Sequence, residues 1–403
     1  MKEYRLGDII DIKHGYAFDG EHIVQDDNGI VLVTPGNFRI GGGFQEEKCK
    51  FFTGEIPKDY VLSAGDYIVT MTDLSKEIDT LGYSAIVPKS NRTYLHNQRI
   101  GLISFKNDEC YTGYIYFLMR THLYQRSIAN TSTGATVHHT SPAKIYDYRF
   151  SAPDYETQRK IADYLFAYEK LIENNQKQIK LLEEAAQRLY KEWFVDLRFP
   201  GHETTPITDG IPEGWRETTI GDETEVKRGG SPRPIQEYLS DEGLNWLKIS
   251  DATASNSPFI YQIKEKIKPE GLRKTVFMKA GTIILSNSAT PGIPKILKID
   301  TCIHDGWLYF PNLQLSNEYM YHLFLQIRSD LVSRATGAVF TNLRTDILKG
   351  YRFIKPDDYI LDLFNKQVKP IFSEIDCLHQ QVLLLTEARD RLLPKLMNGE
   401  IEV

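Results

Sequence analysis

The segment TGATVHHTSPAKIYDYRFSAP, residues 133–153, is written a second time as TGAVFTNLRTDILKGYRFIKP, residues 336–356. The copies align without a gap, 203 positions apart; both begin with Thr-Gly-Ala and end with Tyr-Arg-Phe, followed three residues later by Pro. Only 7 of the 21 positions are identical, and the differences gather in the middle. An internal repeat bounds the architecture of a chain before any single element is considered.

A long helical pattern follows each copy, with apolar residues alternating four and three positions apart over more than four heptads. The first seam comprises Ile161, Leu165, Tyr168, Ile172, Asn175, Ile179, Leu182, Ala186, Leu189 and Trp193. The second keeps the register 203 positions further on, with Phe364, Val368, Ile371, Ile375, Leu378, Val382, Leu385, Arg389, Leu392 and Leu396. A single stripe is most often the buried face of a core helix. Two apolar stripes in the same register favour a coiled coil, in which a polar residue such as Asn175 helps to fix the register.

The front halves of the repeat match more loosely. Residues 5–15 correspond to residues 219–229, each ending in a basic residue and glycine, and a turn followed by an apolar strand recurs at 64–69 and 280–285. Short β runs are predicted at 30–34, 100–105 and 307–310, and one helix in each half, at 113–129 and 317–334. Tyr-Arg-Phe at 148–150 and 351–353 is predicted to be a strand that leads out of the domain into its helix.

We therefore expect an α+β chain with an internal pseudo-twofold repeat and two long antiparallel helices between two globular domains. Residues 201–215 are polar and rich in Pro and Gly, which is typical of a linker. The expected boundaries are 1–152 and 215–356 for the globular domains, 153–199 and 357–403 for the helices, and 200–214 for the linker.

Composition gives mixed indications about partners. The chain has 403 residues and a net charge of −6, which argues weakly against nucleic-acid binding. However, residues 215–356 carry 19 Lys and Arg against 15 Asp and Glu. The excess of acidic residues is concentrated in the linker and the C-terminal segment. The four cysteines form no CxxC pair, and there is no signal pattern or apolar run of transmembrane length. Reduced thiols and a cytoplasmic location are the simplest expectation.

The motifs of common enzyme classes are missing. The sequence has no phosphate-binding GxxxxGK[ST], no GxGxxG after a strand, no HExxH and no GxSxG. The acids that follow Pro153 and Pro356 are better explained as first-turn charges favoured by a helix dipole than as a nuclease carboxylate pair. His138-His139 is replaced by Thr-Asn in the second copy, so a shared metal site is not expected. We expect no catalytic residue, no metal and no cofactor.

Three motifs carry a resemblance to a known family. They are Pro153-x-x-Glu-x-Gln-x-x-Ile-Ala continuing to Ile172-Glu-Asn-Asn, then Leu189-Tyr-Lys-Glu-Trp-Phe-Val, and Ile211-Pro-Glu-Gly-Trp at the start of the second half. With this pattern the chain resembles, over its whole length, the specificity subunits of type I restriction–modification systems. The C-terminal helix departs from the pattern, because it lacks Trp-Phe and Glu-x-Gln and carries Arg389 in its seam.

The resemblance implies a function without catalysis. Each globular domain would be a target-recognition domain that reads one part of a bipartite, asymmetric double-stranded DNA target, while the helices set the spacing. Two modification subunits, which use S-adenosylmethionine to methylate adenine, would bind the chain and recruit restriction subunits. From Ile161 to Trp193 a helix would extend about 50 Å at ~1.5 Å per residue. This length corresponds to about 15 base pairs, an upper bound on the separation of the half-sites.

Candidate DNA contacts are polar and cationic residues in the loops of both domains. In the first domain they are Lys13, His14, Thr72, Asp73, Lys76, Asn97, Gln98, Arg99, His138 and His139. In the second they are Lys227, Arg228, Ser231, Arg233, Ser286, Asn287, Ser288, His304, Asp305, Arg334, Thr336, Asn342 and Arg344. The loop Lys-Arg-Gly-Gly-Ser-Pro-Arg is the strongest candidate, because three cations share one turn shaped by Gly and Pro.

Two other interpretations remain open at this point. The chain could be a structural adaptor that holds two protein partners through its coiled coil, in which case basic loops at the globular ends would be unnecessary. It could also be a nuclease or methyltransferase in its own right, which the missing motifs disfavour. Catalytic turnover by the isolated chain with a metal or S-adenosylmethionine would support the interpretation as an enzyme.

Overall fold

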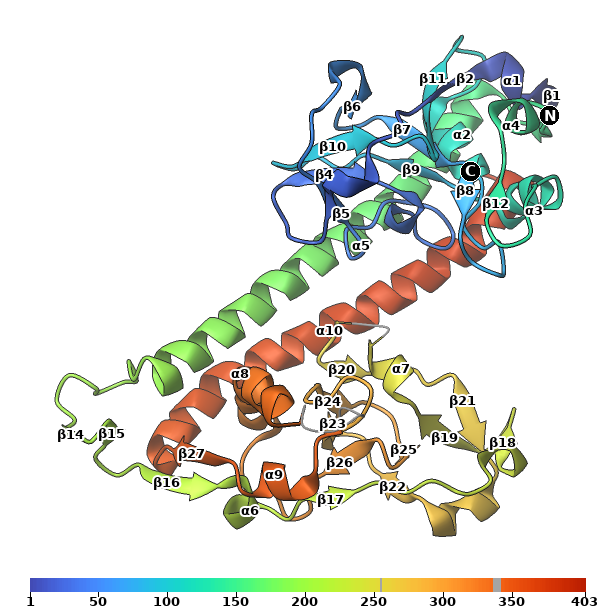
Figure 1. Ribbon diagram of the computed structural model, residues 1–403. Coiled ribbons are helices and arrows are strands. Elements are labelled where there is room, and N and C mark those ends of the chain that lie inside the picture. The colour runs from blue at the N-terminus through green and yellow to red at the C-terminus, as the bar shows by residue number, and fades with distance from the viewer. Residues whose placement is uncertain (254–255, 336–341) are drawn as a thin grey trace. The chain divides into compact units, whose positions relative to one another are not determined.

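The computed structural model describes residues 1–253, 256–335 and 342–403, which fall into two compact units (Figure 1). Unit 1 comprises Met1–Glu173 and Leu383–Val403, and unit 2 comprises Asn174–Val382. The long helices α5 (Tyr155–Tyr190) and α10 (Asp358–Met397) therefore contribute one part to each unit. None of the helices in the described ranges combines the length and hydropathy needed to cross a membrane.

Unit 1 contains two main sheets, with strand orders β2-β11-β7-β9 and β3-β5-β4-β10-β6. The first sheet consists of β2 (Ile10–His14), β11 (Ile100–Phe105), β7 (Tyr67–Thr70) and β9 (Ser84–Ile86). The second consists of β3 (Ile23–Val24), β5 (Lys50–Phe52), β4 (Ile30–Val33), β10 (Thr93–His96) and β6 (Val61–Leu62). The two-stranded pairs are β1 (Lys2–Arg5) with β13 (Arg149–Ala152) and β8 (Thr72–Asp73) with β12 (His138–His139). The short helices are α1 (Leu6–Ile9), α2 (Thr112–Leu118), α3 (His122–Asn130) and α4 (Pro142–Tyr146).

Unit 2 has the corresponding sheets, with strand orders β17-β26-β23-β24-β20 and β18-β21-β19-β25-β22. The first consists of β17 (Lys227–Arg228), β26 (Trp307–Tyr309), β23 (Ile283–Ser286), β24 (Pro294–Leu297) and β20 (Phe259–Ile260). The second consists of β18 (Leu239–Ser240), β21 (Glu265–Ile267), β19 (Leu244–Leu247), β25 (Thr301–Ile303) and β22 (Val276–Met278). The two-stranded pairs are β14 (Ile207–Thr208) with β15 (Ile211–Pro212) and β16 (Arg216–Thr219) with β27 (Arg352–Lys355). The remaining helices are α6 (Ile220–Glu223), α7 (Ile249–Thr253), α8 (Asn317–Ala335) and α9 (Thr345–Lys349).

The repeat seen in the sequence is a repeat of topology. In the second sheet of each unit one internal pair is parallel, β4 with β10 and β19 with β25, while the neighbouring pairs are antiparallel. The strands that open and close each globular region pair in the same register, with Tyr4 opposite Phe150 and Thr218 opposite Phe353. Tyr-Arg-Phe therefore runs into the exit strand in both copies, as predicted.

The acids that follow Pro153 and Pro356 cap the two long helices. Asp154 accepts a hydrogen bond from the Thr157 backbone N–H (3.1 Å), and Asp357 accepts one from the Ile360 N–H (2.8 Å). The first N–H groups of a helix have no partner within the helix, so a carboxylate placed there stabilises the helix start. Hydrogen bonds from Thr157 also hold the pKa of Asp154 below its ordinary value.

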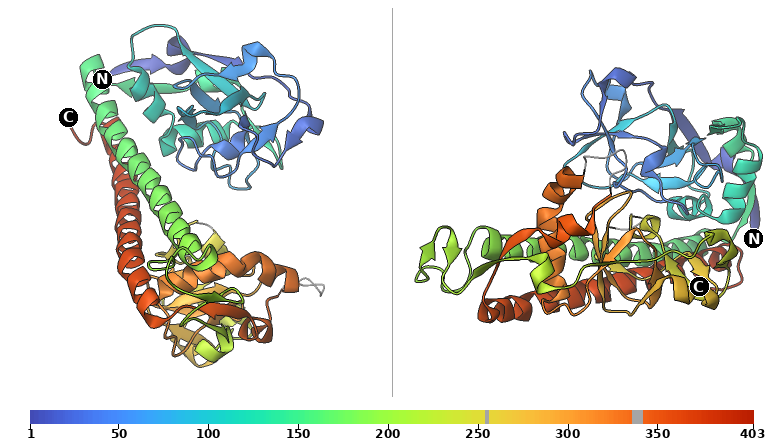
Figure 2. Two further views of the ribbon diagram at one scale, coloured as in Figure 1. Left: turned by 90° about the vertical axis from the view of Figure 1, so that its left-hand side faces the viewer. Right: turned by 60° about the horizontal axis from the view of Figure 1, so that its bottom comes forward.

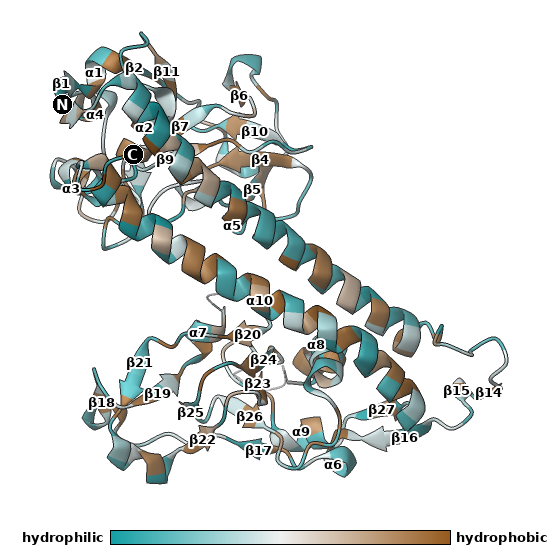
Figure 3. Cartoon of the chain, turned by 180° about the vertical axis from the view of Figure 1, so that it is seen from behind, coloured by the Kyte–Doolittle hydropathy of each residue, from teal (hydrophilic) through white to brown (hydrophobic). Residues whose placement is uncertain are grey.

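The long helices close the core of each unit with the faces predicted from the heptad pattern (Figure 3). In unit 1, Ile161 and Leu165 of α5 belong to one buried cluster with Leu393 and Leu396 of α10. In unit 2, the buried cluster combines residues of both helices with the α8 and β23–β24 region; its helix members include Ile179, Ala186, Phe364, Val368, Ile375 and Leu378. Figures 1 and 2 show α5 and α10 running side by side within each unit.

Two predicted elements differ from the structure. The helix expected at 113–129 is divided into α2 and α3, because Thr121 caps the second helix: its Oγ1 accepts from the Tyr124 N–H (3.3 Å) and donates to the Leu118 carbonyl (2.8 Å). The linker contains the β14–β15 hairpin and is anchored at its end by Trp215, whose ring centroid lies 4.7 Å from that of Phe199. Both rings are buried, so the linker is attached to the core of unit 2.

Candidate nucleic-acid interface

In unit 2, several of the predicted DNA contacts gather around the turn between β25 and β26. The Asp305 carboxylate accepts hydrogen bonds from Ser231 Oγ (2.6 Å) and Arg233 Nη2 (3.2 Å). The Asp305 backbone carbonyl accepts a hydrogen bond from Arg228 Nε. The loop Lys-Arg-Gly-Gly-Ser-Pro-Arg and this turn therefore form one polar surface, to which two arginines and a carboxylate contribute.

A glycine permits this close contact. A Cβ at Gly229 would lie 2.2 Å from the His304 carbonyl oxygen, which no other residue type could accommodate without a backbone shift. Backbone hydrogen bonds from Gly229 to Trp307 (2.9 Å) and from Gly230 to Ile303 (3.2 Å) hold the loop against the turn. The loop is thus positioned by its main chain as well as by Asp305.

Charge at this surface is fixed by the same contacts. The hydrogen bond from Ser231, together with the nearby Arg228 and Arg233, lowers the pKa of Asp305, so the carboxylate is ionised at neutral pH. Burial lowers the pKa of His304, whose Nδ1 accepts a hydrogen bond from the Gly306 N–H (2.7 Å). Neutral His304 therefore supports the turn and adds no positive charge to it.

Unit 1 places its candidates at the same topological position. A Cβ at Gly15 would lie 2.1 Å from the Asn97 carbonyl oxygen, just as Gly229 meets His304. The exposed side chains around this contact are those of Lys13, His14, Gln98 and Arg99. Lys13 Nζ donates to the Asp59 carbonyl (2.9 Å) and lies 4.8 Å from the centroid of the Tyr60 ring. Sequence patterns did not indicate Asp59 or Tyr60, which belong to a separate loop.

Three buried candidates in unit 1 shape loops and do not present their side chains to solvent. Asp73 is 2% exposed, and its carboxylate accepts hydrogen bonds from Ser75, Thr80 and Leu81. Burial would raise the pKa of Asp73, but the hydrogen bonds outweigh burial and lower it. Thr72 and Asn97 are also buried; Thr72 Oγ1 lies 3.1 Å from His139 Nδ1, and Asn97 Oδ1 accepts from the Arg99 N–H. In this structure the three side chains support loops, and their contact with bases stays an untested prediction.

Ser286 and Asn287 are the corresponding buried candidates in unit 2. Ser286 Oγ accepts from the Ile293 N–H (2.9 Å) and donates to the Thr290 carbonyl (2.6 Å). Asn287 Nδ2 donates to the Asp305 carbonyl (3.2 Å). Both side chains are at most 2% exposed, so they also shape the loop beneath the surface.

The first Thr-Gly-Ala segment forms a closed loop. Thr133 and His139 exchange two backbone hydrogen bonds (3.0 and 2.8 Å), and Gly134 has a φ of +108°, a conformation that favours glycine. The segment then bonds to the end of β7, from the Thr140 N–H to the Met71 carbonyl (3.0 Å). In unit 2 the Leu343 N–H donates to the Asn287 carbonyl (2.7 Å) at the same position. The second segment itself, and the candidate Thr336, lie outside the described residues.

The other candidates are exposed or half-exposed; Lys227 lies on β17, His138 and His139 form β12, Arg334 lies in the last turn of α8, and the rest lie on loops. Several are paired with acids of their own unit: Lys227 with Glu225 (2.6 Å), Arg334 with Asp330 (2.9 Å) and Arg344 with Asp346 (3.6 Å). Lys76, His139 and Asn342 are exposed, while His138 and Ser288 are partly buried. Contacts of this exposed kind contribute little to stability and leave the cations accessible.

The predicted seam residues of both helices are buried or half-buried. The buried members are Ile161, Leu165, Ile172, Asn175, Ile179, Trp193, Val368, Ile375 and Leu378; Leu182, Leu189, Val382, Leu385 and Leu392 are half-buried. Asn175 is 6% exposed, and its Nδ2 donates to Gln381 Oε1 of α10 (3.0 Å) within unit 2. The polar interruption of the first seam thus meets a polar partner on the second helix.

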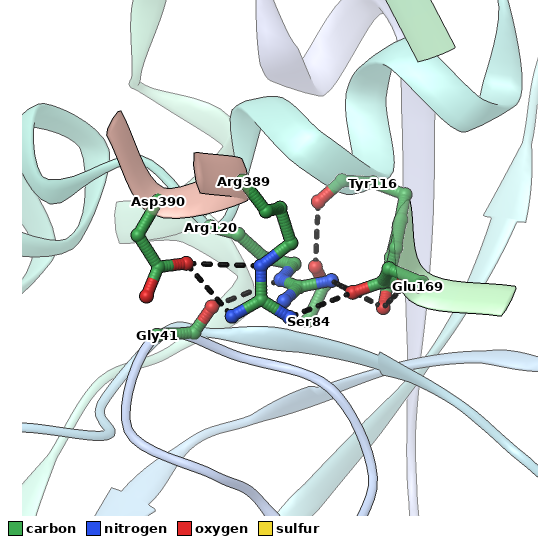
Figure 4. A network of polar contacts seen from close by, with 7 residues as sticks. All are labelled: Gly41, Ser84, Tyr116, Arg120, Glu169, Arg389 and Asp390. Atoms are coloured by element: carbon green, nitrogen blue, oxygen red, sulfur yellow. Dashed lines mark hydrogen bonds and ion pairs between the residues drawn. The ribbon is translucent and has the colours of Figure 1, made fainter. Parts of the chain in front are cut away.

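Arg389, which interrupts the second seam, also has a partner. Its Nη1 lies 3.5 Å from Glu169 Oε1 of α5, and the same carboxylate pairs with Arg120, whose side chain is 2% exposed (Figure 4). Arg120 Nε donates to the Gly41 carbonyl (2.9 Å), and its Nη1 donates to the Tyr116 hydroxyl (2.7 Å). Sequence reasoning missed Arg120, although the unexplained charge of Arg389 in an apolar seam was a signal that a partner was needed.

The three successive glycines at 41–43 belong to this network as well. All three have positive φ, and a Cβ at Gly42 would lie 2.5 Å from Arg120 Cγ. The glycines therefore let the loop close over the arginine. Within residues 1–253, 256–335 and 342–403, no three His, Cys, Asp or Glu side chains are grouped to hold a metal ion.

Comparison with known proteins adds independent observations. Residues 1–184 match the family model described as the type I restriction modification DNA specificity domain. The MjaIX specificity subunit of a type I restriction enzyme from Methanocaldococcus jannaschii is 26% identical, over 80% of this chain and 76% of the relative. The HindI specificity subunit from Haemophilus influenzae is 24% identical over 99% of both chains.

The fold agrees with these matches. The crystal structure of a type I restriction–modification S subunit from M. genitalium superimposes with a TM-score of 0.60, covering 98% of this chain and 96% of that chain at 14% identity. The chain therefore shares its overall fold with that structure. By its motifs, by the domain matched over residues 1–184 and by relatives that align over most of its length, the chain is similar to the specificity subunits of type I restriction–modification systems.

Proposed function

We propose that this chain is the DNA specificity subunit of a type I restriction–modification complex, and that each unit reads one part of a bipartite, asymmetric target. One observation carries the proposal: the two units repeat one topology but present different residues at the same surface. The basic residue before the tightly packed glycine is His14 in unit 1 and Arg228 in unit 2, and Gln98 is replaced by Asp305. One scaffold with different reading groups suits a non-palindromic target.

We assign the recognition domains to residues 1–152 and 215–356, joined by the linker 200–214. The helical segments 153–199 and 357–403 set the spacing between the two parts of the target. Support comes from the polar pair Asn175–Gln381, because a polar residue within an apolar seam favours one register over the alternatives. A fixed register is what a spacer requires.

The partners in this proposal are two modification subunits, which bind S-adenosylmethionine and methylate adenine, and the restriction subunits that they recruit. The long helices keep large apolar side chains on their outer faces, including Tyr164 and Leu171 in unit 1 and Leu181 and Tyr359 in unit 2, with exposed fractions of 51–69%. Such residues suit protein partners better than DNA. Four free cysteines agree with a reducing cytoplasm as the place of assembly.

Methylation-sensitive sequencing of the host genome tests the proposal directly. We expect adenine methylation at a motif with two unequal parts separated by a fixed gap, lost when the gene is deleted. One heptad centred on Asn175 and one centred on Gln381 are then removed together. Seven residues span about 10 Å of helix, so the gap should shorten by about 3 base pairs while both half-sequences persist. A changed half-sequence contradicts the assignment of reading to the globular domains.

A further inference from the structure

We propose that Arg233, held in place by Asp305, reads a guanine in the part of the target contacted by unit 2. This inference rests on the proposed function and adds the identity of one base and a positioning residue. Two observations carry it: the contact of Arg233 with Asp305, and the absence of a carboxylate at the equivalent turn of unit 1.

The contact restrains the direction of a highly exposed side chain. Arg233 Nη2 lies 3.2 Å from Asp305 Oδ2, although the Arg233 side chain is 80% exposed. Asp305 is in turn fixed by Ser231, which bonds to its Oδ1 (2.6 Å) and accepts from its backbone N–H (3.3 Å). Immobilising a flexible arginine before binding removes part of the entropic cost of ordering it at the interface.

A held guanidinium has a preferred base. The remaining N–H donors of arginine form a planar fork that matches the O6 and N7 acceptors of guanine in the major groove. Bonding of one amino group to Asp305 restricts the direction of that fork. The ionised carboxylate itself repels DNA phosphates, so it weakens general affinity while it positions the arginine.

Unit 1 lacks this arrangement. Gly15 packs against Asn97 as Gly229 packs against His304, which aligns Gln98 with Asp305. Gln98 is uncharged and exposed, and the basic residue before Gly15 is His14. The carboxylate-held arginine is therefore particular to unit 2, and its guanine belongs to one part of the target only.

The test selects duplexes from a random-sequence library with the full-length chain assembled with the modification subunits of its host. Four variants are compared with the wild type: Arg233→Ala, Arg233→Lys, Asp305→Asn and, as a matched control, Asp300→Asn. Asp300 lies in a neighbouring turn of unit 2 and pairs with Lys279 (2.7 Å), so the control makes the same charge change at another ion pair.

We expect wild-type and Asp300→Asn complexes to prefer guanine at one position of the unit 2 sequence. Arg233→Ala and Arg233→Lys should each reduce this preference by roughly 5- to 150-fold, because lysine keeps the charge but not the fork. Asp305→Asn should also reduce the preference, while binding to random duplexes is unchanged or tighter. The unit 1 sequence should persist in every variant, which shows that the complex is folded.

Two results would overturn the inference: a preference for guanine that survives Asp305→Asn or Arg233→Lys, or a unit 2 sequence without guanine. If the wild-type complex selects no sequence at all, the proposed function itself fails. The two failures are thus distinguishable in one experiment.

Discussion

The Glu169 carboxylate on α5 lies 3.5 Å from the Arg389 guanidinium on α10, within unit 1. The same carboxylate pairs with the buried Arg120, and Arg389 also pairs with Asp390 (2.7 Å), so two cations from different elements share a small acidic cluster. In unit 2 the position equivalent to Glu169 is occupied by Phe372, and that equivalent to Arg389 by Ala186 on the first helix; both are buried. At these equivalent positions, unit 1 therefore has an ion pair between the two long helices, whereas unit 2 has packed apolar side chains.

We predict that Glu169→Gln destabilises unit 1 by about 2–4 kcal/mol. Removal of the carboxylate leaves Arg120 charged and buried without a counter-ion, and the loss stays below that of a fully buried pair because the Glu169 side chain keeps 22% exposure. Hydrogen exchange of the α2 amides reports this loss. The control is Glu156→Gln on the same helix, whose partner Arg159 is exposed; it should change stability by less than about 1 kcal/mol. Equal effects would contradict a special role for Glu169.

The two tightly packed glycines should be equally intolerant of a methyl group. Gly15→Ala and Gly229→Ala each place a Cβ about 2 Å from a backbone oxygen, so the loop must shift and stability should fall by roughly 1–3 kcal/mol. Each variant should weaken recognition of only one part of the target, as measured by sequence selection. Gly20→Ala is the control, since no atom lies within 4 Å of the added methyl group. Loss of both half-sequences from either substitution would argue against independent reading.

Unit 2 should lose stability as the pH rises towards neutrality. Burial raises the pKa of Glu183 from 4.5 to about 7, while the nearby Lys295 acts in the opposite direction. Because the native state holds this proton more tightly than the unfolded chain, the contribution of Glu183 is fully present below pH 4.5 and is lost as the pH rises to 7. Glu183→Gln should remove this loss. Urea unfolding should therefore show that the variant becomes more stable relative to the wild type as the pH rises from about 5 to about 7.5.

The amine partner gives the opposite slope. Burial lowers the pKa of Lys295 from 10.5 to about 8, so its contribution to stability rises between pH 8 and 10.5.

The matched control for Glu183→Gln is Glu184→Gln, because Glu184 is the exposed neighbour of Glu183 on α5. If Glu183→Gln changes the free energy of unfolding by the same amount at pH 5 and pH 7.5, Glu183 does not titrate in this range.

The sequence was most informative where a pattern had to repeat. The heptad register, the helix-capping acids and the exit strands that carry Tyr-Arg-Phe follow from spacing alone, because each depends on local geometry that both copies need. The resemblance to specificity subunits rested on the same segments. The division between α2 and α3 was missed because Thr121 interrupts an apolar pattern that otherwise continues as a helix.

Contacts between distant loops were beyond sequence reasoning. Residue type and loop position could name Asp305, Ser231 and Arg233 as candidates, but 74 positions separate Ser231 from Asp305, and only the fold brings them together. Polar character alone also could not separate exposed candidates such as Arg99 from buried residues such as Asp73, since both residue types occur in such loops. Burial, which the fold determines, makes that distinction.

The pairing of β1 with β13 and of β16 with β27 has a genetic consequence. The chain enters and leaves each globular region on neighbouring antiparallel strands, about 5 Å apart. A coding segment bounded by these strands can therefore be replaced by another of different length without moving the ends that attach it. The shared Tyr-Arg-Phe sequence marks one boundary of the globular region in both copies. Recombination between related genes at that boundary would exchange one domain as a cassette and leave the helices intact.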